Sequence, residues 1–208
     1  MEEPKTDKRE HILNVAEKVF GELGYEGAST RHLAGEAGIN MAMLNYYFGS
    51  KDGLLKAIIE RRIGGTRQAL LDIKEQPITA WEKLTQAIDI YLNKLTTNNH
   101  FHRLVHREIS LQQRSEMSDF ISESVFNNLA IFRAIIAEGV QKEEFKLIDI
   151  EMTVASIFGT FYYIVNSRQV TASMLQQDLQ DPEVLEKIIK PRIKKFLHDY
   201  LRAFLFIK

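Results

Sequence analysis

The spacing of apolar residues constrains the fold more than any other feature of the sequence. Apolar residues return every three or four positions through nearly all of the 208 residues, which is the period of an amphipathic α-helix. Alternation with a period of two, the pattern of a half-buried strand, is nearly absent. The chain has only four prolines, so few segments are barred from helical structure. The sequence therefore predicts an all-α protein.

Composition narrows the class of protein further. The chain is 45% hydrophobic and 26% charged and has no cysteine, which is the balance of a globular protein without disulfides. The N-terminal segment MEEPKTDKRE is charged and lacks the apolar core of a signal peptide. The longest apolar run, residues 153–165, is shorter than the roughly 20 residues that cross a bilayer. We therefore expect a cytoplasmic protein without a membrane partner.

Turn residues divide the helical pattern into segments. Gly24, Gly38 and the pair Gly49-Ser50 each mark the end of a segment. Gly64 and Gly65 lie inside a longer segment, where we expect them to end the helix or to kink it. The expected helices lie at residues 7–23, 29–37, 40–48, 51–74, 78–97, 100–113, 117–140, 149–168 and 182–206.

The helices expected at residues 29–37 and 40–48 are too short to be stable alone, because isolated helices under roughly 12–15 residues are marginal in water. A supporting neighbour is needed, and the first helix provides one. Ala34 is small enough for a close helix crossing, and Gly38 suits a left-handed turn. Two short helices joined by a tight turn, the second free on its outer side, form a helix-turn-helix.

Residues 6–55 resemble the TetR family of transcriptional regulators. The motifs that carry the resemblance are GYEGAST, TRHLAGEAGI and LNYYFGSKDGLL, preceded by Ile12, Ala16 and Phe20 in the first helix. The resemblance implies a three-helix DNA-binding domain over residues 1–50. It also implies a larger helical domain over residues 51–208, which binds an effector and dimerises.

The resemblance further implies which residues lie at double-stranded DNA. Those near backbone phosphates would be Thr30, Arg31, Tyr46, Tyr47 and Lys51; those at base edges in the major groove would be Met41, Ala42, Met43 and Asn45, with Asn40 beginning the recognition helix. The residues expected at base edges differ from those usual in the family. Because Asn pairs with adenine and Ala or Met packs on the thymine methyl group, we expect an A/T-rich half-site.

The last two expected helices carry a pattern typical of a dimer interface. Apolar residues of the last helix fill two adjacent stripes, which is wider than one core-facing face needs. The preceding helix has small residues four positions apart, which let another helix approach closely. Both patterns favour a four-helix bundle of two protomers, with a tightly packed monomer as the alternative. The expected interface residues are Ala155, Gly159, Ile193, Phe196, Tyr200 and Phe204.

Aromatic residues of the larger domain are candidates for an effector pocket, although each is also a candidate for the plain core. The candidates are Trp81, Tyr91, Phe101, His102, Phe126, Tyr162 and Tyr163. No charged cluster identifies a ligand, so we expect an apolar or aromatic compound. His102 and His106 have a spacing that zinc can use. The segment lacks the Glu of a metalloprotease motif, and we expect neither a metal site nor a cofactor.

Two functions follow from these features. The first is a ligand-responsive repressor that binds a palindromic operator as a homodimer. The second is a helical small-molecule-binding or adaptor protein with a vestigial helix-turn-helix. Charge supports the second, since residues 1–62 hold 9 Lys and Arg against 10 Asp and Glu, whereas phosphate binding usually needs a basic surface. An enzyme is not expected, because the sequence has no cysteine nucleophile and no Gly-x-Ser-x-Gly motif.

Overall fold

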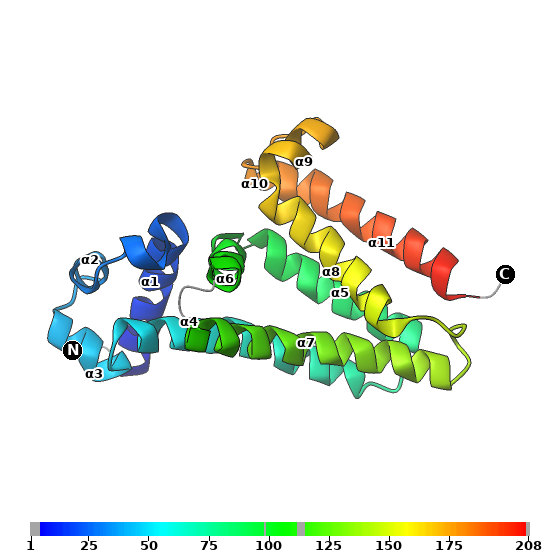
Figure 1. Ribbon diagram of the computed structural model, residues 1–208, viewed down its shortest axis with the longest axis horizontal. Coiled ribbons are helices and arrows are strands. Elements are labelled where there is room, and N and C mark those ends of the chain that lie inside the picture. The colour runs from blue at the N-terminus through cyan, green and yellow to red at the C-terminus, as the bar shows by residue number, and fades with distance from the viewer. Residues whose placement is uncertain (1–4, 98, 112–114, 207–208) are drawn as a thin grey trace. The chain divides into compact units, whose positions relative to one another are not determined.

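Every regular element in the described part of the chain is a helix, which confirms the predicted all-α fold. The computed structural model describes residues 5–97, 99–111 and 115–206. Figure 1 shows how the helices follow one another along the chain. They are α1 (Lys5–Gly27), α2 (Thr30–Glu36), α3 (Met41–Phe48), α4 (Lys51–Lys74), α5 (Ala80–Thr97), α6 (Asn99–Leu111), α7 (Ser115–Gln141), α8 (Ile150–Asn166), α9 (Arg168–Leu175), α10 (Pro182–Val184), the π-helix η1 (Leu185–Ile189) and α11 (Lys190–Leu205).

The helices form two compact units. The first unit comprises Met1–Gly65 and His100–Ser124, and the second comprises Thr66–Asn99 and Val125–Lys208. Both α4 and α7 contribute one part to each unit. The domain boundary expected at residue 50 falls at the turn before α4, and it stays a prediction.

In the first unit, side-chain caps begin each of the three helices that follow α1. The Ser29 hydroxyl accepts a hydrogen bond from the His32 amide at 3.1 Å, at the start of α2. The Asn40 side chain accepts one from the Met43 amide at 2.8 Å, at the start of α3. The Ser50 hydroxyl accepts one from the Gly53 amide at 3.0 Å, at the start of α4. Each cap satisfies an amide that a short helix would otherwise leave unpaired.

Burial within the first unit stabilises these short helices. Leu33 of α2 and Leu44 of α3 are almost completely buried, as are Leu13 and Phe20 of α1. Gly38 has a φ of 64°, and this left-handed turn joins α2 to α3. The two expected short helices are confirmed, and α2 packs against both α1 and α3.

Gly24 ends the regular part of α1 with a φ of 72°. The guanidinium of Arg107, on α6, lies against this turn, and a Cβ atom at position 24 would stand 2.6 Å from its Nη1 atom. The left-handed backbone conformation therefore favours glycine here, whereas the exposed Arg107 guanidinium is the flexible end of a side chain that can move aside.

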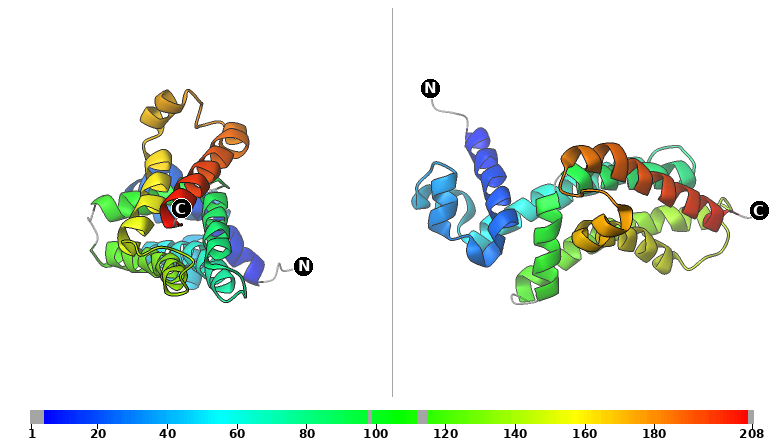
Figure 2. Two further views of the ribbon diagram at one scale, coloured as in Figure 1. Left: turned by 90° about the vertical axis from the view of Figure 1, so that its right-hand side faces the viewer. Right: turned by 90° about the horizontal axis from the view of Figure 1, so that it is seen from above.

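The second unit has its own hydrophobic core, to which α5, α7, α8 and α11 contribute. At its centre the Tyr91 ring lies 4.7 Å from the ring of Phe158 and 5.3 Å from that of Phe161. Leu197 and Leu201 of α11 complete the core. Figure 2 shows α11 lying beside α5 in this unit.

Three features of the helices differ from expectation. Gly64 and Gly65 do not end α4, because each costs only about 1 kcal/mol in a helix and buried Ile58 and Leu70 anchor the helix on either side. α9 was not expected, because it follows α8 almost directly, with Ser167 between them. The last helix begins with the π-turn η1 ahead of Pro191, whose ring cannot fit a regular α-helical interior.

One helix in the described part of the chain is long and apolar enough to cross a membrane, which the sequence analysis did not identify. It spans Glu116–Gln141 with a mean hydropathy of 1.3. Phe132, Ile135 and Ile136 of this helix are completely buried in the core of the second unit. The helix is therefore a core helix of the fold.

Candidate nucleic-acid interface and effector cavity

The outer face of α3 is exposed while its inner face holds the helix in the first unit. Tyr46 is 71% exposed and Met41 is 46% exposed. Ala42 and Asn45 are also exposed, whereas Leu44 is buried. Four side chains predicted at DNA therefore point away from the core, on a helix that Leu44 fixes in place.

The other predicted base-contact residues are partly engaged by the fold. Asn40 is exposed, but its side-chain oxygen caps α3 through the Met43 amide. The Met43 side chain is half-buried. Asn40 therefore keeps both amide N–H donors and one lone pair of its oxygen for a ligand.

The residues predicted near phosphates lie at helix starts and at the end of α3. Thr30 is half-buried and Arg31 is exposed, both in the first turn of α2. Tyr47 is half-buried, with its ring 5.3 Å from the Tyr46 ring. Amides at a helix N-terminus and hydroxyl groups can bind phosphate without a net positive charge.

Lys51 begins α4 and is held by an aromatic ring. Its Nζ atom lies 3.9 Å from the centre of the Tyr25 ring, a cation–π contact. The Tyr25 hydroxyl donates a hydrogen bond to Asp52 at 2.8 Å, and the ring stacks on Phe20 at 5.7 Å. Tyr25 therefore joins the end of α1 to the start of α4.

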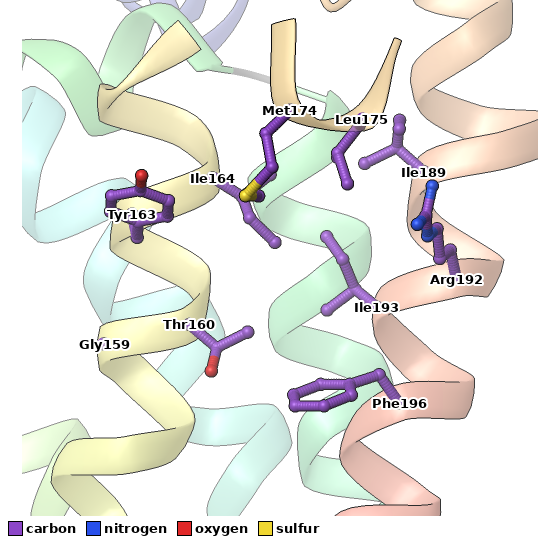
Figure 3. Close-up of a pocket in the computed structure, with 10 residues that line it drawn as sticks. All are labelled: Gly159, Thr160, Tyr163, Ile164, Met174, Leu175, Ile189, Arg192, Ile193 and Phe196. Atoms are coloured by element: carbon purple, nitrogen blue, oxygen red, sulfur yellow. The ribbon is translucent and has the colours of Figure 1, made fainter. Parts of the chain in front are cut away.

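The second unit contains a cavity of about 500 Å³ between α8, α9 and α11 (Figure 3). Its walls are mostly apolar, with one charged side chain, that of Arg192. The lining residues are Gly159, Thr160, Tyr163, Ile164, Met174, Leu175, Ile189, Arg192, Ile193 and Phe196. Tyr163 is a predicted pocket residue, and Gly159, Ile193 and Phe196 are predicted interface residues.

The sequence pattern did not single out Met174 or Arg192. Met174 lies on α9, a helix that the periodicity did not reveal because it is only eight residues long. The available signal was the apolar pair Met174-Leu175, close in sequence to the end of α8.

Tyr91 and Tyr162, two other predicted pocket residues, form a polar pair inside the core of the second unit. Tyr91 is buried and Tyr162 is half-buried. Burial raises the pKa of Tyr91 well above its ordinary value, and a hydrogen bond with Tyr162 contributes to the shift. Burial also raises the pKa of Tyr162. Both hydroxyls therefore stay protonated near neutral pH.

The remaining predicted pocket residues lie at separate places. Trp81 packs edge-on against His198 and Phe206, with ring centres 5.9 and 5.5 Å away. Phe126, in contrast, is 66% exposed. Phe101 is buried in the first unit, with half-buried His102 beside it.

No metal site appears among the described residues, where no group of three or more His, Cys, Asp or Glu could hold a metal ion. His102 is described and half-buried. The side chain of His106 lies outside the described residues. Within the part of the chain that the structure describes, no further metal-ligating side chains gather around His102.

The predicted interface residues of α11 form a ladder of parallel rings. The rings of Phe196, Tyr200 and Phe204 stack with 6.0 Å between neighbouring centres. All three are exposed in the protomer, and Ala155 and Gly159 on α8 are exposed as well. Ile193, in contrast, is buried. An exposed face that combines large rings with small residues is typical of a helix-packing surface.

Comparison with known proteins connects these two units to one family. Residues 12–58 match the model of bacterial regulatory proteins of the tetR family. Residues 81–191 match the model of the tetracyclin repressor-like C-terminal domain, which alone covers more than half of the chain. The chain belongs to the TetR family.

TetR-family relatives are similar in sequence to this protein over most of its length. The fatty acid metabolism regulator protein of Bacillus subtilis is 26% identical over 157 residues, which cover 75% of this chain and 80% of the relative. The transcriptional repressor NicS of Pseudomonas putida is 25% identical over 185 residues, 84% of each chain. This TetR-family protein is thus a DNA-binding transcriptional regulator of the helix-turn-helix type, and not an enzyme.

Solved structures agree with this assignment. The crystal structure of FadR from Bacillus subtilis in complex with stearoyl-CoA superposes with a TM-score of 0.71 at 25% identity, over 90% of this chain and 96% of FadR. A putative fatty acid metabolism regulator from Clostridium perfringens superposes with a TM-score of 0.76, over 95% of this chain and 100% of that chain. At 19% identity, the second likeness shows the TetR fold alone.

Proposed function

We propose that this TetR-family regulator is a repressor that binds a palindromic operator as a homodimer and releases it when an effector binds. The observation that carries the DNA-binding part is the exposed outer face of α3. Met41, Ala42, Asn45 and Tyr46 project from a helix whose inner side is buried. A short helix presented in this way is suited to the major groove.

The near-neutral charge of the first unit is compatible with operator binding. The capping residues Ser29 and Asn40 are exposed, so the N-termini of α2 and α3 lie at the surface, and helix N-termini attract phosphate. Arg31 and Lys51 add positive charge close to these two helices. The same neutrality predicts that non-specific DNA binding is weak, because that binding is mostly electrostatic.

Homodimerisation is supported by the ladder of Phe196, Tyr200 and Phe204 on α11 and by the small residues of α8. A palindromic operator requires two recognition helices related by a two-fold axis, which a homodimer provides. We expect Tyr200→Asp to weaken the dimer by at least tenfold, since it places a charge in the middle of an apolar face. Lys195→Glu, on the solvent side of the same helix, is the control. Sedimentation at several protein concentrations measures both.

The proposed effector is a long-chain acyl-CoA. The support comes from FadR of Bacillus subtilis, which is 25% identical and was crystallised with stearoyl-CoA. The alternative, a binding or adaptor protein with a vestigial helix-turn-helix, predicts effector binding without operator binding.

Selection of the purified protein against random duplex DNA at physiological salt tests the proposal. An enriched palindrome is the expected result, with the enriched DNA released on addition of long-chain acyl-CoA. An operator that represses a downstream reporter in the presence of the protein would establish the sign of regulation. A folded protein that enriches no sequence would contradict operator binding and favour the adaptor alternative.

A further inference from the structure

We infer that Arg9 of α1 binds a backbone phosphate of the operator beside the C-terminal end of α3, with the Phe48 ring holding its guanidinium in place. The inference rests on the proposed function, because it takes duplex DNA as the ligand of α3. Arg9 is not among the residues that the TetR resemblance implies at DNA. It adds α1 to a DNA-binding surface that otherwise consists of α2, α3 and the start of α4.

Arg9 lies directly beside the last residue of the recognition helix. The central carbon of its guanidinium stands 5.4 Å from the centre of the Phe48 ring, and Phe48 is the last residue of α3. Arginine stacks on aromatic faces through a cation–π contact. The contact therefore brings a positive charge from α1 to the C-terminal end of α3.

Position 9 supplies a charge that the recognition helix itself lacks. Residues 41–48 include no charged side chain, and the last turn of α3 has no basic residue. The carbonyl groups at the C-terminus of a helix carry a partial negative charge, which repels phosphate. Since α3 has eight residues and is thus about 12 Å long, the width of the major groove, both of its ends come near phosphates. The Arg9 guanidinium removes the repulsion at the C-terminal end.

The charge of Arg9 is only loosely engaged within the protein. Its one ion pair in the described part of the chain joins Nη1 to Glu10 Oε1 at 3.8 Å, and an exposed pair of this kind contributes little. Arg61 of α4 holds Glu10 more closely, at 2.8 Å. The Arg9 side chain is 44% exposed. Its planar guanidinium is therefore open to a phosphate, which it can bind through two parallel hydrogen bonds.

A second donor suited to phosphate lies at the same end of α3. The Tyr47 ring is 6.1 Å from the Phe48 ring, and the TetR resemblance implies that Tyr47 lies near a phosphate. The Phe48 ring thus neighbours both the guanidinium of Arg9 and the phenol of Tyr47. A cation and a hydroxyl together are typical donors to the oxygens of a DNA backbone.

Arg9 is not needed to hold α1 in the first unit. Leu13 and Phe20 of the same helix are completely buried, so apolar packing attaches α1 to its neighbours. The partly exposed guanidinium of Arg9 adds one cation–π contact to this packing. Removal of its charge should therefore leave the protein folded, and DNA binding can be measured apart from stability.

The salt dependence of operator binding tests the contact. The full-length protein is titrated into the duplex that selection enriches, at salt concentrations between about 50 and 200 mM. Arg9→Gln should weaken binding by roughly tenfold. It should also reduce the slope of log affinity against log salt by about 0.9, the value for one phosphate contact in B-DNA. Binding to the operator and to mismatched duplexes should weaken equally, because phosphate contacts carry no sequence information.

Two further variants and a modified operator locate the contact. Arg9→Lys should keep the slope but bind more weakly than wild type, because lysine lacks the planar guanidinium that stacks on Phe48. Lys18→Gln makes the same charge change on an exposed residue of α1, about 13 Å further along the helix, and should alter neither affinity nor slope. Methylphosphonate neutralises one phosphate at a time. At one position in each half-site it should weaken binding of wild type but not of Arg9→Gln.

Four results would overturn the inference. The first is an unchanged slope in Arg9→Gln, or an equal response of variant and wild type to every methylphosphonate; the repressor proposal would still stand. The second is an equal loss in Lys18→Gln, which would indicate a general effect of charge. The third is a melting temperature of Arg9→Gln well below that of wild type, which would assign Arg9 to the fold. The fourth is a wild-type protein that binds no operator, which would overturn the proposed function as well.

Discussion

The Glu17 carboxylate accepts hydrogen bonds from two consecutive arginines of α4. Its Oε2 atom lies 2.8 Å from Arg61 Nη2 and 2.8 Å from Arg62 Nε. The Glu17 side chain is only 3% exposed, whereas those of Arg61 and Arg62 are 21% and 35% exposed. Since Glu17 lies on α1, this cluster fixes α1 to α4 within the first unit.

Removal of the Glu17 charge should destabilise the protein markedly. Glu17→Gln removes the most buried anion of the cluster from two partly buried guanidinium groups, and we expect a loss of about 2–3 kcal/mol in the free energy of unfolding. Glu10→Gln is the matched control, because Glu10 pairs with the same Arg61 but is 46% exposed; it should cost less than about 1 kcal/mol. Urea denaturation measures both. Equal effects would show that burial of Glu17 is not what makes the cluster stabilising.

Asn45 is the residue most suited to direct base recognition, because it is exposed on α3 and its side chain has no role as a cap. Asn45→Ala should reduce operator affinity by roughly tenfold or more, since a bidentate Asn–adenine pair contributes about 1–3 kcal/mol. Thermal stability should stay the same. Gln68→Ala, on the exposed face of α4, is the control. An operator without A·T pairs at the contacted position, or an unchanged affinity, would contradict this role.

Gly64 and Gly65 lower the helical stability of the middle of α4, because glycine is a poorer helix former than alanine. Both are exposed, and a Cβ atom at either position would meet nothing within 4 Å. Gly64→Ala and Gly65→Ala should each stabilise the protein by about 1 kcal/mol. If flexing of α4 transmits the effector signal, both variants should bind the operator as wild type does but release it less completely with effector. A loss of stability in either variant would mean that α4 departs from a straight helix at these glycines.

Glu138 gives the second unit a stability that depends on pH. Hydrogen bonds from Lys142 and Lys83 hold its pKa below the ordinary value of 4.5, and the Lys83 side chain is only 6% exposed. Because the folded pKa is lowered, this stabilisation is complete above the ordinary pKa and is lost as the pH falls through the folded value. Glu138→Gln should therefore cost about 3 kcal/mol at neutral pH.

The pH dependence separates this effect from a general loss of packing. The difference between wild type and Glu138→Gln should shrink below the ordinary pKa of 4.5, as measured by denaturation at a series of pH values. Lys142→Met should have a small effect at every pH, because Lys142 is 56% exposed. A difference that stays constant down to acid pH would refute the electrostatic explanation.

Sequence patterns predicted the first unit well because its signals are local. The caps at Ser29, Asn40 and Ser50 and the turn at Gly38 depend on residues within a few positions of one another. The Glu17 cluster was not predictable in the same way. Its partners are 44 and 45 positions away, and periodicity carries no information on which charged residues meet.

The candidate cavity could not be predicted from the sequence for the same reason, since it depends on contacts between distant segments. Apolar periodicity identified the helices that contain Gly159 and Ile193, but it did not distinguish a packed core from an open wall. Whether Phe196 or Tyr91 borders empty space depends on how neighbouring helices cross. The sequence pattern also did not predict α9, and this helix supplies Met174 and Leu175 to the cavity.

The recognition helix has one further consequence for how this regulator could change over time. Leu44 and the Asn40 cap hold α3 in place, while Met41, Ala42 and Asn45 contribute little to folding because they are exposed. Substitutions at these three positions are thus nearly free of a stability penalty. A few substitutions on the outer face of α3 can therefore change the operator of a duplicated copy of this protein without loss of its fold or its effector.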